Sequence, residues 1–198
     1  MKKITLLAAV ALGGLLSAFT LLNDAPEWKM DPSHSSFSFT VTHLGTPVLG
    51  LFQKTDAVLK FDPADANAGS VKFTIDASSV YTGQPMRDHH LKTADFLDTA
   101  KYPVIVFQSE KFTKKNEQEY VVTGNLTVKD VTKKVDVPFT ITALKDHPFS
   151  KDKMLLGLKA QTTFKRSDFH VGSGNFAGDA VVGDDVTIQL FAEFSRPK

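Results

Sequence analysis

Cysteine is absent from all 198 residues of the chain. That absence excludes disulfide bonds, thiol catalysis, cysteine metal sites and a thioether-linked lipid anchor. Tryptophan occurs once and tyrosine three times, against sixteen phenylalanines. The fold must therefore be held together by its hydrophobic core, and the aromatic side chains in that core carry few hydrogen-bonding groups.

An excess of charge of either sign is also missing. Lys and Arg together number 23, and Asp and Glu number 22. Loss of Lys2 and Lys3 with a leader would change this to 21 against 22, a net charge of −1. Such a balance argues against nucleic acid as a partner. A glycine-rich phosphate loop, a dinucleotide fingerprint and a G-x-S-x-G elbow are absent too.

Residues 1–22 contain the one long apolar run. A basic start, Met1 to Lys3, precedes a stretch interrupted only by single Thr and Ser residues and by small glycines. This is the pattern of a secretory signal peptide, although the best cleavage site, Leu16-Ser17-Ala18, is weak in its first position. We expect an exported protein, which is membrane-tethered if this segment is retained as an anchor.

Residues 23–198 read as a single domain of about eight strands. Apolar and polar residues alternate from residue 35 onward, and short turns separate the alternating runs. We expect an all-β fold in which an antiparallel sheet closes into a barrel, because closure removes exposed edges. On the strands, the inward side chains expected to contact a ligand are Phe37, Phe39, Val41, Phe73, Ile75, Leu126, Phe139, Ile141, Leu158 and Phe164.

The inner face mixes large and small residues. Gly124, Ala143, Ala160 and Ala192 fall among the phenylalanines. An eight-stranded barrel is just wide enough either to be filled by side chains or to hold one small ligand. A hollow barrel would hold an apolar, lipid-like molecule. A solid barrel would instead be a structural or interaction protein.

The segment Thr82 to Pro103, hereafter the cover segment, neither alternates nor resembles a loop. We expect it to contain a short helix and to pack Leu91 and Phe96 inward. We also expect it to cover the second face of the Tyr102–Thr113 strand. Arg87 to His90, with Asp95 nearby, suggest metal-assisted hydrolysis as an alternative function. Adjacent imidazoles diverge, however, whereas helical zinc ligands share a face at i and i+4. We therefore favour ion pairs and helix caps here.

A second polar cluster, Arg166 to Asp168, precedes a glycine-rich stretch, Val171 to Asp185, that we expect to be a loop. Two interpretations remain open for it. Arg166 either pairs locally with Asp168 or helps to form the polar rim of a pocket.

These motifs resemble the YceI-like, polyisoprenoid-binding family of bacterial proteins. The resemblance covers the chain from about Trp28 to the C-terminus. It rests on the following strings: Trp28 with Asp31-Pro32 and His34-Ser35; Phe39 with His43-Leu44-Gly45; Gly50-x-Phe52; Phe61-Asp62-Pro63; Ser79-Val80-x-Thr82-Gly83; Arg87-Asp88-x-His90-Leu91; Asp95-Phe96; Lys101-Tyr102-Pro103; Phe107-x-Ser109; Gly124-x-Leu126-Thr127; and Arg166-x-Asp168-Phe169.

The resemblance implies an eight-stranded, lipocalin-like barrel with a short helical segment and no enzymatic activity, cofactor or metal. The implied ligand is a polyisoprenoid or another long-chain amphiphile, such as an isoprenoid quinone, a fatty acid or a fatty amide. Its head group would meet the rim at Arg87, His90, Arg166 and Asp168. A periplasmic or secreted location and transient membrane contact are implied, while a homodimer is left open. His170 departs from the family, where glycine commonly follows Asp-Phe.

Overall fold

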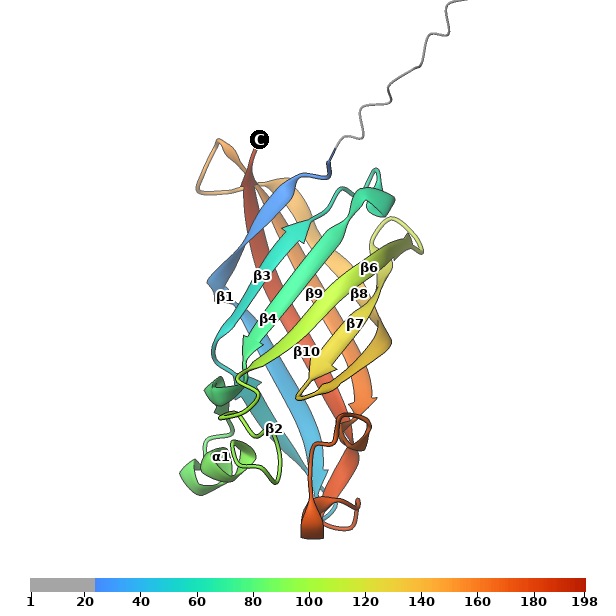
Figure 1. The fold of residues 1–198 in the computed structure, drawn as a ribbon. Helices are drawn as coiled ribbons and strands as arrows, with labels where there is room; N and C mark the ends of the chain where they lie inside the picture. Colours follow the sequence, from blue (N-terminus) through green and yellow to red (C-terminus); the bar gives the residue numbers. More distant parts are fainter. Residues whose placement is uncertain (1–23) are drawn as a thin grey trace, which may run out of the picture.

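The computed structural model describes residues 24–198, which form ten strands, one α-helix and four short 3-10 turns (Figure 1). The predicted leader, residues 1–22, lies outside the described residues. The strands are β1 (Glu27–His43), β2 (Thr46–Phe52), β3 (Thr55–Lys60), β4 (Ser70–Asp76), β5 (Val80–Tyr81), β6 (Val104–Lys114), β7 (Glu119–Val128), β8 (Val131–Asp146), β9 (Lys153–Lys165) and β10 (Val182–Pro197). The helix is α1 (Pro85–Leu91), and the 3-10 turns are η1 (Ala66–Ala68), η2 (Ala77–Ser79), η3 (Arg166–Phe169) and η4 (Gly174–Phe176).

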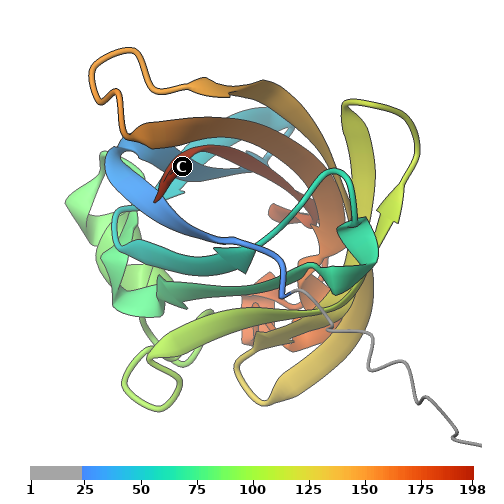
Figure 2. The same ribbon diagram turned by 90° about the horizontal axis from the view of Figure 1, so that it is seen from above.

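Antiparallel pairing joins the strands into a closed barrel (Figure 2). The order is β10-β9-β8-β7-β6-β4-β3-β1, and β10 pairs with β1 to close the ring. β3 and β2 pair with the same side of β1, β3 near its start and β2 near its end. β5 pairs with β2 and extends the wall past the end of β4. The wall is therefore eight strands wide, which confirms the predicted all-β barrel with one short helix.

β1 bulges in the middle of the wall. On one side its register with β10 shifts between Asp31 and Ser36. On the other side, its pairing with β3 ends at Lys29 and its pairing with β2 begins at Phe37. Pro32 has no N–H to donate to either neighbour. In the bulge, the Asp31 carboxylate accepts a hydrogen bond from the Ser33 N–H at 2.8 Å and contacts His34 Nδ1 at 2.8 Å.

The upper end of the barrel in Figure 1, where both β1 begins and β10 ends, is solid. Trp28, Phe61, Tyr120 and Leu156 are almost completely buried there. The Trp28 indole N–H donates to the Phe61 carbonyl at 2.8 Å. The Phe61 ring lies 5.3 Å from that of Tyr120 in an edge-to-face arrangement, a favoured geometry for aromatic pairs.

The lower end is covered by the cover segment and by residues 170–181, hereafter the glycine-rich loop (Figure 1). The cover segment contains the predicted short helix, α1, whose N-cap Gln84 accepts a hydrogen bond from the Arg87 N–H at 2.6 Å. Its predicted position over the outer face of β6 is wrong, because Val104 there remains 42% exposed. The predicted loop was also too long, since β10 already begins at Val182. None of the helices in the described part of the chain is long and apolar enough to span a membrane.

Candidate functional site

A cavity of about 280 Å³ lies inside the barrel and extends from the aromatic side chains Phe61, Phe112 and Phe194, near the upper end, toward the lower end. Its walls come from the inward faces of the strands, and the cover segment contributes Leu91, Phe96 and Leu97. The polar lining residues are Gln161, Thr162, Lys165 and Arg166; all the others are apolar. A space of this kind takes an apolar molecule or an apolar chain.

The limits of the hollow are visible along single strands. On β10, which runs from the lower to the upper end, Ile188 and Leu190 line the cavity and are only half-buried. Phe194, which lines the upper limit of the cavity, is buried, as is Ala192. On β9, Leu158 lines the cavity and is half-buried, while Leu156 is completely buried. Side chains that face inward but remain partly exposed mark empty space inside the barrel.

Most side chains chosen from the alternation do lie on the cavity wall. They are Phe37, Phe39, Val41, Phe73, Ile75, Leu91, Phe96, Leu126, Phe139, Leu158 and Phe164. The placement of Ile141 was wrong. It points inward and is buried, but it belongs to the packed core and not to the cavity wall. The β8–β9 register shift between Ile141 and Ala143 lies at this point of the wall.

Sequence reasoning missed several wall residues. Ile188 and Leu190 belong to a recognised alternating run, so their pattern already carried the signal. Phe52 was harder to find, because β2 also places Leu49 on the outside, where it is 59% exposed, and so conceals the alternation. Phe52 packs against Phe37 and Phe39, with ring centroids 5.9 and 5.5 Å apart.

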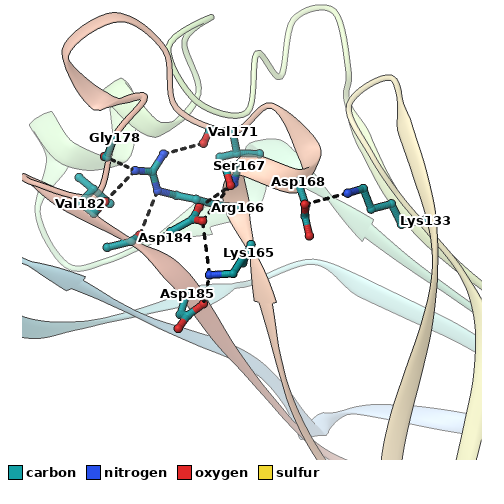
Figure 3. A network of polar contacts seen from close by, with 11 residues as sticks. Lys133, Lys165, Arg166, Ser167, Asp168, Val171, Gly178, Val182, Asp184 and Asp185 are labelled. Carbon is teal, nitrogen blue, oxygen red and sulfur yellow. Dashed lines mark hydrogen bonds and ion pairs between the residues drawn. The ribbon is translucent and has the colours of Figure 1, made fainter.

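Arg166 is buried at the lower end, and its guanidinium holds the chain that precedes β10 (Figure 3). Nε donates to the Gly183 carbonyl at 3.0 Å and Nη1 to the Val171 carbonyl at 2.8 Å. Nη2 donates to the carbonyls of Gly178 and Val182 at 2.8 and 2.7 Å. Four of the five N–H donors of a guanidinium are therefore occupied. The structure places Arg166 as an anchor of the glycine-rich loop.

The expected local pair between Arg166 and Asp168 is wrong. Asp168 instead lies 2.8 Å from Lys133 of β8, outside the cavity (Figure 3). Beside Arg166, the backbone N–H and the hydroxyl of Ser167 donate to Asp184 at 3.0 and 2.8 Å. These bonds, the backbone one foremost, lower the pKa of Asp184.

Arg87 and Asp88 meet through Thr82 and form no ion pair with each other among the described contacts. The buried Asp88 carboxylate accepts the Thr82 N–H at 2.7 Å and its hydroxyl at 2.5 Å. Arg87, which is exposed, donates to the Thr82 hydroxyl oxygen and carbonyl at 2.7 and 2.9 Å. These contacts fix the start of the cover segment and leave Arg87 outside the cavity.

His90 and Asp95 connect the cover segment to the glycine-rich loop. His90 Nε2 lies 2.9 Å from an Asp95 carboxylate oxygen, and the other oxygen accepts the Ser173 hydroxyl at 3.1 Å. These two hydrogen bonds lower the pKa of Asp95, that with His90 contributing most. The Phe176 ring lies 5.0 Å from His90 and 5.3 Å from Phe96. The contacts close the lower end of the barrel, and they place His90 behind Phe96 and not on the cavity wall.

Asp88, His89, His90 and Asp95, which suggested a metal site, do not form a group with metal-ligand spacing among the described residues. Within residues 24–198, the one group of three side chains with metal-ligand spacing is Asp31, His34 and Glu193, whose ligand atoms lie within 4.8 Å of one another. That group lies on the outer side of the β1 bulge. There the Asp31 hydrogen bond raises the pKa of His34.

Known proteins resemble this barrel in sequence and in structure. A UPF0312 protein of Pectobacterium carotovorum is 36% identical over 174 residues, 86% of this chain and 88% of that one. The crystal structure of BcnA from Burkholderia cenocepacia has a TM-score of 0.76 at 30% identity, covering 83% of this chain and 98% of that one. A polyisoprenoid binding domain from Saccharophagus degradans, implicated in plant cell wall breakdown, has a TM-score of 0.62 at 14% identity, covering 86% and 98%, and thus shares the fold.

The sequence pattern of the YceI-like domain matches residues 28–194, from the first buried residue of β1 to the last buried residue of β10. The matched range contains every strand that closes the barrel and every residue that lines the cavity. This chain belongs to the YceI-like domain family.

Proposed function

We propose that this protein is an exported carrier that holds the tail of a polyisoprenoid or another long-chain amphiphile inside its barrel. The observation that carries the proposal is the cavity of about 280 Å³ with an almost completely apolar wall. It is larger than the engineered apolar cavity of about 150 Å³ that stays dry and binds benzene. The structural similarity to a polyisoprenoid binding domain agrees with a prenyl chain as ligand.

Burial of the tail supplies the affinity of such a carrier. Each methylene group removed from water contributes about 0.8 kcal/mol, so a tail of about twenty carbons could contribute on the order of 16 kcal/mol before ordering costs are subtracted. Tail length should therefore determine affinity more than the head group does. Export is part of the proposal because residues 1–22 have the pattern of a secretory leader.

A substitution that fills the cavity tests the proposal. Ala160 lies on the cavity wall in β9, and its neighbour Lys159 is exposed on the outer face. We expect Ala160→Phe to abolish binding of geranylgeraniol, measured by native mass spectrometry, because the new ring occupies the space of the tail. Lys159→Phe should bind like the unsubstituted protein. Failure of the unsubstituted protein to bind any prenyl compound, fatty acid or fatty amide would overturn the proposal.

Export is tested separately. When the full chain is expressed in a Gram-negative host, we expect the mature protein in the periplasmic fraction, with a mass that corresponds to loss of the leader. Recovery of the uncut chain in the membrane fraction would instead indicate a tether, and recovery in the cytoplasm would contradict export.

A further inference from the structure

The β1 bulge leaves a seam in the barrel wall. From Met30 to Ser36, β1 pairs with neither β2 nor β3, since its pairing with β3 ends at Lys29 and its pairing with β2 begins at Phe37. Across the seam, Gln53 and Lys54 join β2 to β3. Their backbone N–H groups donate to the carbonyl and hydroxyl of Ser79, at 3.1 and 3.0 Å. One edge of the seam, the turn between β2 and β3, is therefore hydrogen-bonded to η2, and the opposite edge is the β1 bulge.

A groove of about 650 Å³, hereafter the side groove, lies on the outer surface along this seam. The residues that line it are Pro32, Ser35, Ser36, Phe37, Leu51, Phe52, Gln53, Lys54, Thr55, Asp56, Thr74 and Asp76. Phe37 and Phe52 also line the central cavity. Both rings are half-buried, and their centroids lie 5.9 Å apart. The two phenyl rings thus separate the groove from the cavity.

The lower end offers a less accessible path. There the hydrogen bond between Asp95 and Ser173 and the ring contacts of Phe176 join the cover segment to the glycine-rich loop. Arg166 further fixes the loop through the Val171 and Gly178 carbonyls and the start of β10 through those of Val182 and Gly183. Opening that end would break all these contacts. At the seam Phe37 and Phe52 form the last pair of the β1–β2 ladder, and from Met30 to Ser36 β1 has no partner on this side. Fewer contacts therefore have to break there for the rings to move aside.

The charges in the side groove restrict the head group. Lys54 is the one cation among the groove residues, and it lies 3.8 Å from the Asp76 carboxylate, which the Ser78 hydrogen bonds keep below its ordinary pKa. Asp56 adds a second carboxylate. One lysine against two aspartates repels a phosphate or a carboxylate. The hydroxyls of Ser35, Ser36 and Thr55 and the amide of Gln53 suit an uncharged group that donates and accepts hydrogen bonds.

We infer that the side groove binds a neutral, hydrogen-bonding head group, and that the amphiphile tail reaches the cavity past the Phe37 and Phe52 rings, beside the unpaired stretch of β1. This inference rests on the carrier function proposed above and adds to it the position and chemistry of the head-group site. The amphiphile enters through the wall of the barrel, and its head group remains in the groove at the surface.

Head-group chemistry is tested with ligands that share one C20 prenyl tail. Geranylgeraniol, geranylgeranoic acid and geranylgeranyl phosphate are compared by calorimetry with the full chain. We expect the acid and the phosphate to bind about five- to tenfold more weakly than the alcohol, since a like charge at the groove lowers affinity. Asp56→Asn should reduce this difference. Equal or tighter binding of the phosphate would overturn the inference while leaving the carrier function intact.

The path is tested with single cysteines, because the natural chain has none to compete for labelling. Gln53→Cys at the seam, Asn175→Cys in the glycine-rich loop and Lys159→Cys on β9 are all at exposed positions. Each is coupled to a bulky maleimide, and the rate of geranylgeraniol uptake is measured by stopped flow. We expect the label at residue 53 to slow uptake about tenfold or more, while labels at 175 and 159 leave the rate unchanged.

Slowing by the label at residue 175 and not at 53 would show that the tail passes through the lower end, and would overturn the path. Equal rates for all three labelled proteins would overturn it as well. If none of the three unlabelled variants, nor the unsubstituted protein, takes up geranylgeraniol, the carrier function itself fails, and the inference with it.

Discussion

A single guanidinium joins the glycine-rich loop to the start of β10. Arg166 is 5% exposed and donates to four backbone carbonyls, so its removal would break four hydrogen bonds at once. Gly172 lies against the same guanidinium, where an added Cβ would clash with Nη1, and its φ of +99° also favours glycine.

We expect Arg166→Ala to lower the free energy of unfolding by about 3 kcal/mol or more, measured by urea denaturation. Arg166→Lys should lose almost as much, because an ammonium group lacks the planar set of donors that reaches four carbonyls. Arg87→Ala is the control. Its side chain is exposed and bonds only to Thr82, so it should change stability by less than about 0.5 kcal/mol. Equal losses for the two alanine variants would contradict the anchoring role.

Gly50 lets β2 approach the Phe39 ring. A Cβ at this position would overlap that ring, whereas a Cβ at Gly178 would meet nothing within 4 Å. We expect Gly50→Ala to destabilise the protein by about 1–3 kcal/mol, because the ring must leave its position in the core. Gly178→Ala should be close to neutral. Thermal unfolding of the two variants under the same conditions measures the difference, and the prediction fails if both melt like the unsubstituted protein.

At the scale of elements, the cover segment is joined to the glycine-rich loop chiefly through Asp95. Hydrogen bonds from His90, the larger contribution, and from Ser173 lower the pKa of Asp95 below its ordinary value of 3.8. A lowered folded-state pKa means that the stabilisation is present above pH 3.8. It is lost as the pH falls through the lower, folded value.

Acidification should therefore release the glycine-rich loop from the cover segment. We expect the NMR signals of the Phe176 ring to lose their shift from the neighbouring His90 and Phe96 rings as the pH falls below 3.8. Asp95→Asn should abolish this transition, while Asp179→Asn, at an exposed position of the same loop, should preserve it. Persistence of the transition in Asp95→Asn would assign it to another group.

At the scale of the whole molecule, the barrel is solid at its upper end and hollow below. β9 crosses the boundary between the two, so it offers two leucines in the same strand with different surroundings. Leu156 is completely buried, and Leu158 borders the cavity.

Leu156→Ala should cost about 3–5 kcal/mol of unfolding free energy, because it opens a new cavity in close-packed surroundings. Leu158→Ala should cost about 1–2 kcal/mol, because one side of Leu158 has few contacts to lose. Denaturant unfolding of ligand-free protein measures both. Saturation with geranylgeraniol should increase the loss of unfolding free energy caused by Leu158→Ala, because in the proposed complex the tail would contact that side chain. Equal costs without ligand would show that the barrel is packed along its whole length.

Alternation of apolar and polar residues was enough to predict the barrel and most of its inner wall. Residues such as Phe37, Phe73 and Phe139 were found because a strand reverses the direction of its side chains at every step, so parity alone assigns the face. Phe52 was missed where the outer face also carries leucines. Ile141 was misplaced because parity gives the side of the wall but not the height along the barrel at which the hollow ends.

The polar contacts could not be predicted in the same way. Asp168 stands two residues from Arg166, yet it pairs with Lys133, and Arg166 reaches carbonyls as far as Gly183. Asp95 meets Ser173 across 78 residues of sequence. The alternation in the sequence reflects the local geometry of a strand, which points successive side chains to opposite faces. The partners of a buried charge, the solid upper end and the seam beside β1 depend on which distant segments the closed barrel brings together, and so were decided only by the tertiary structure.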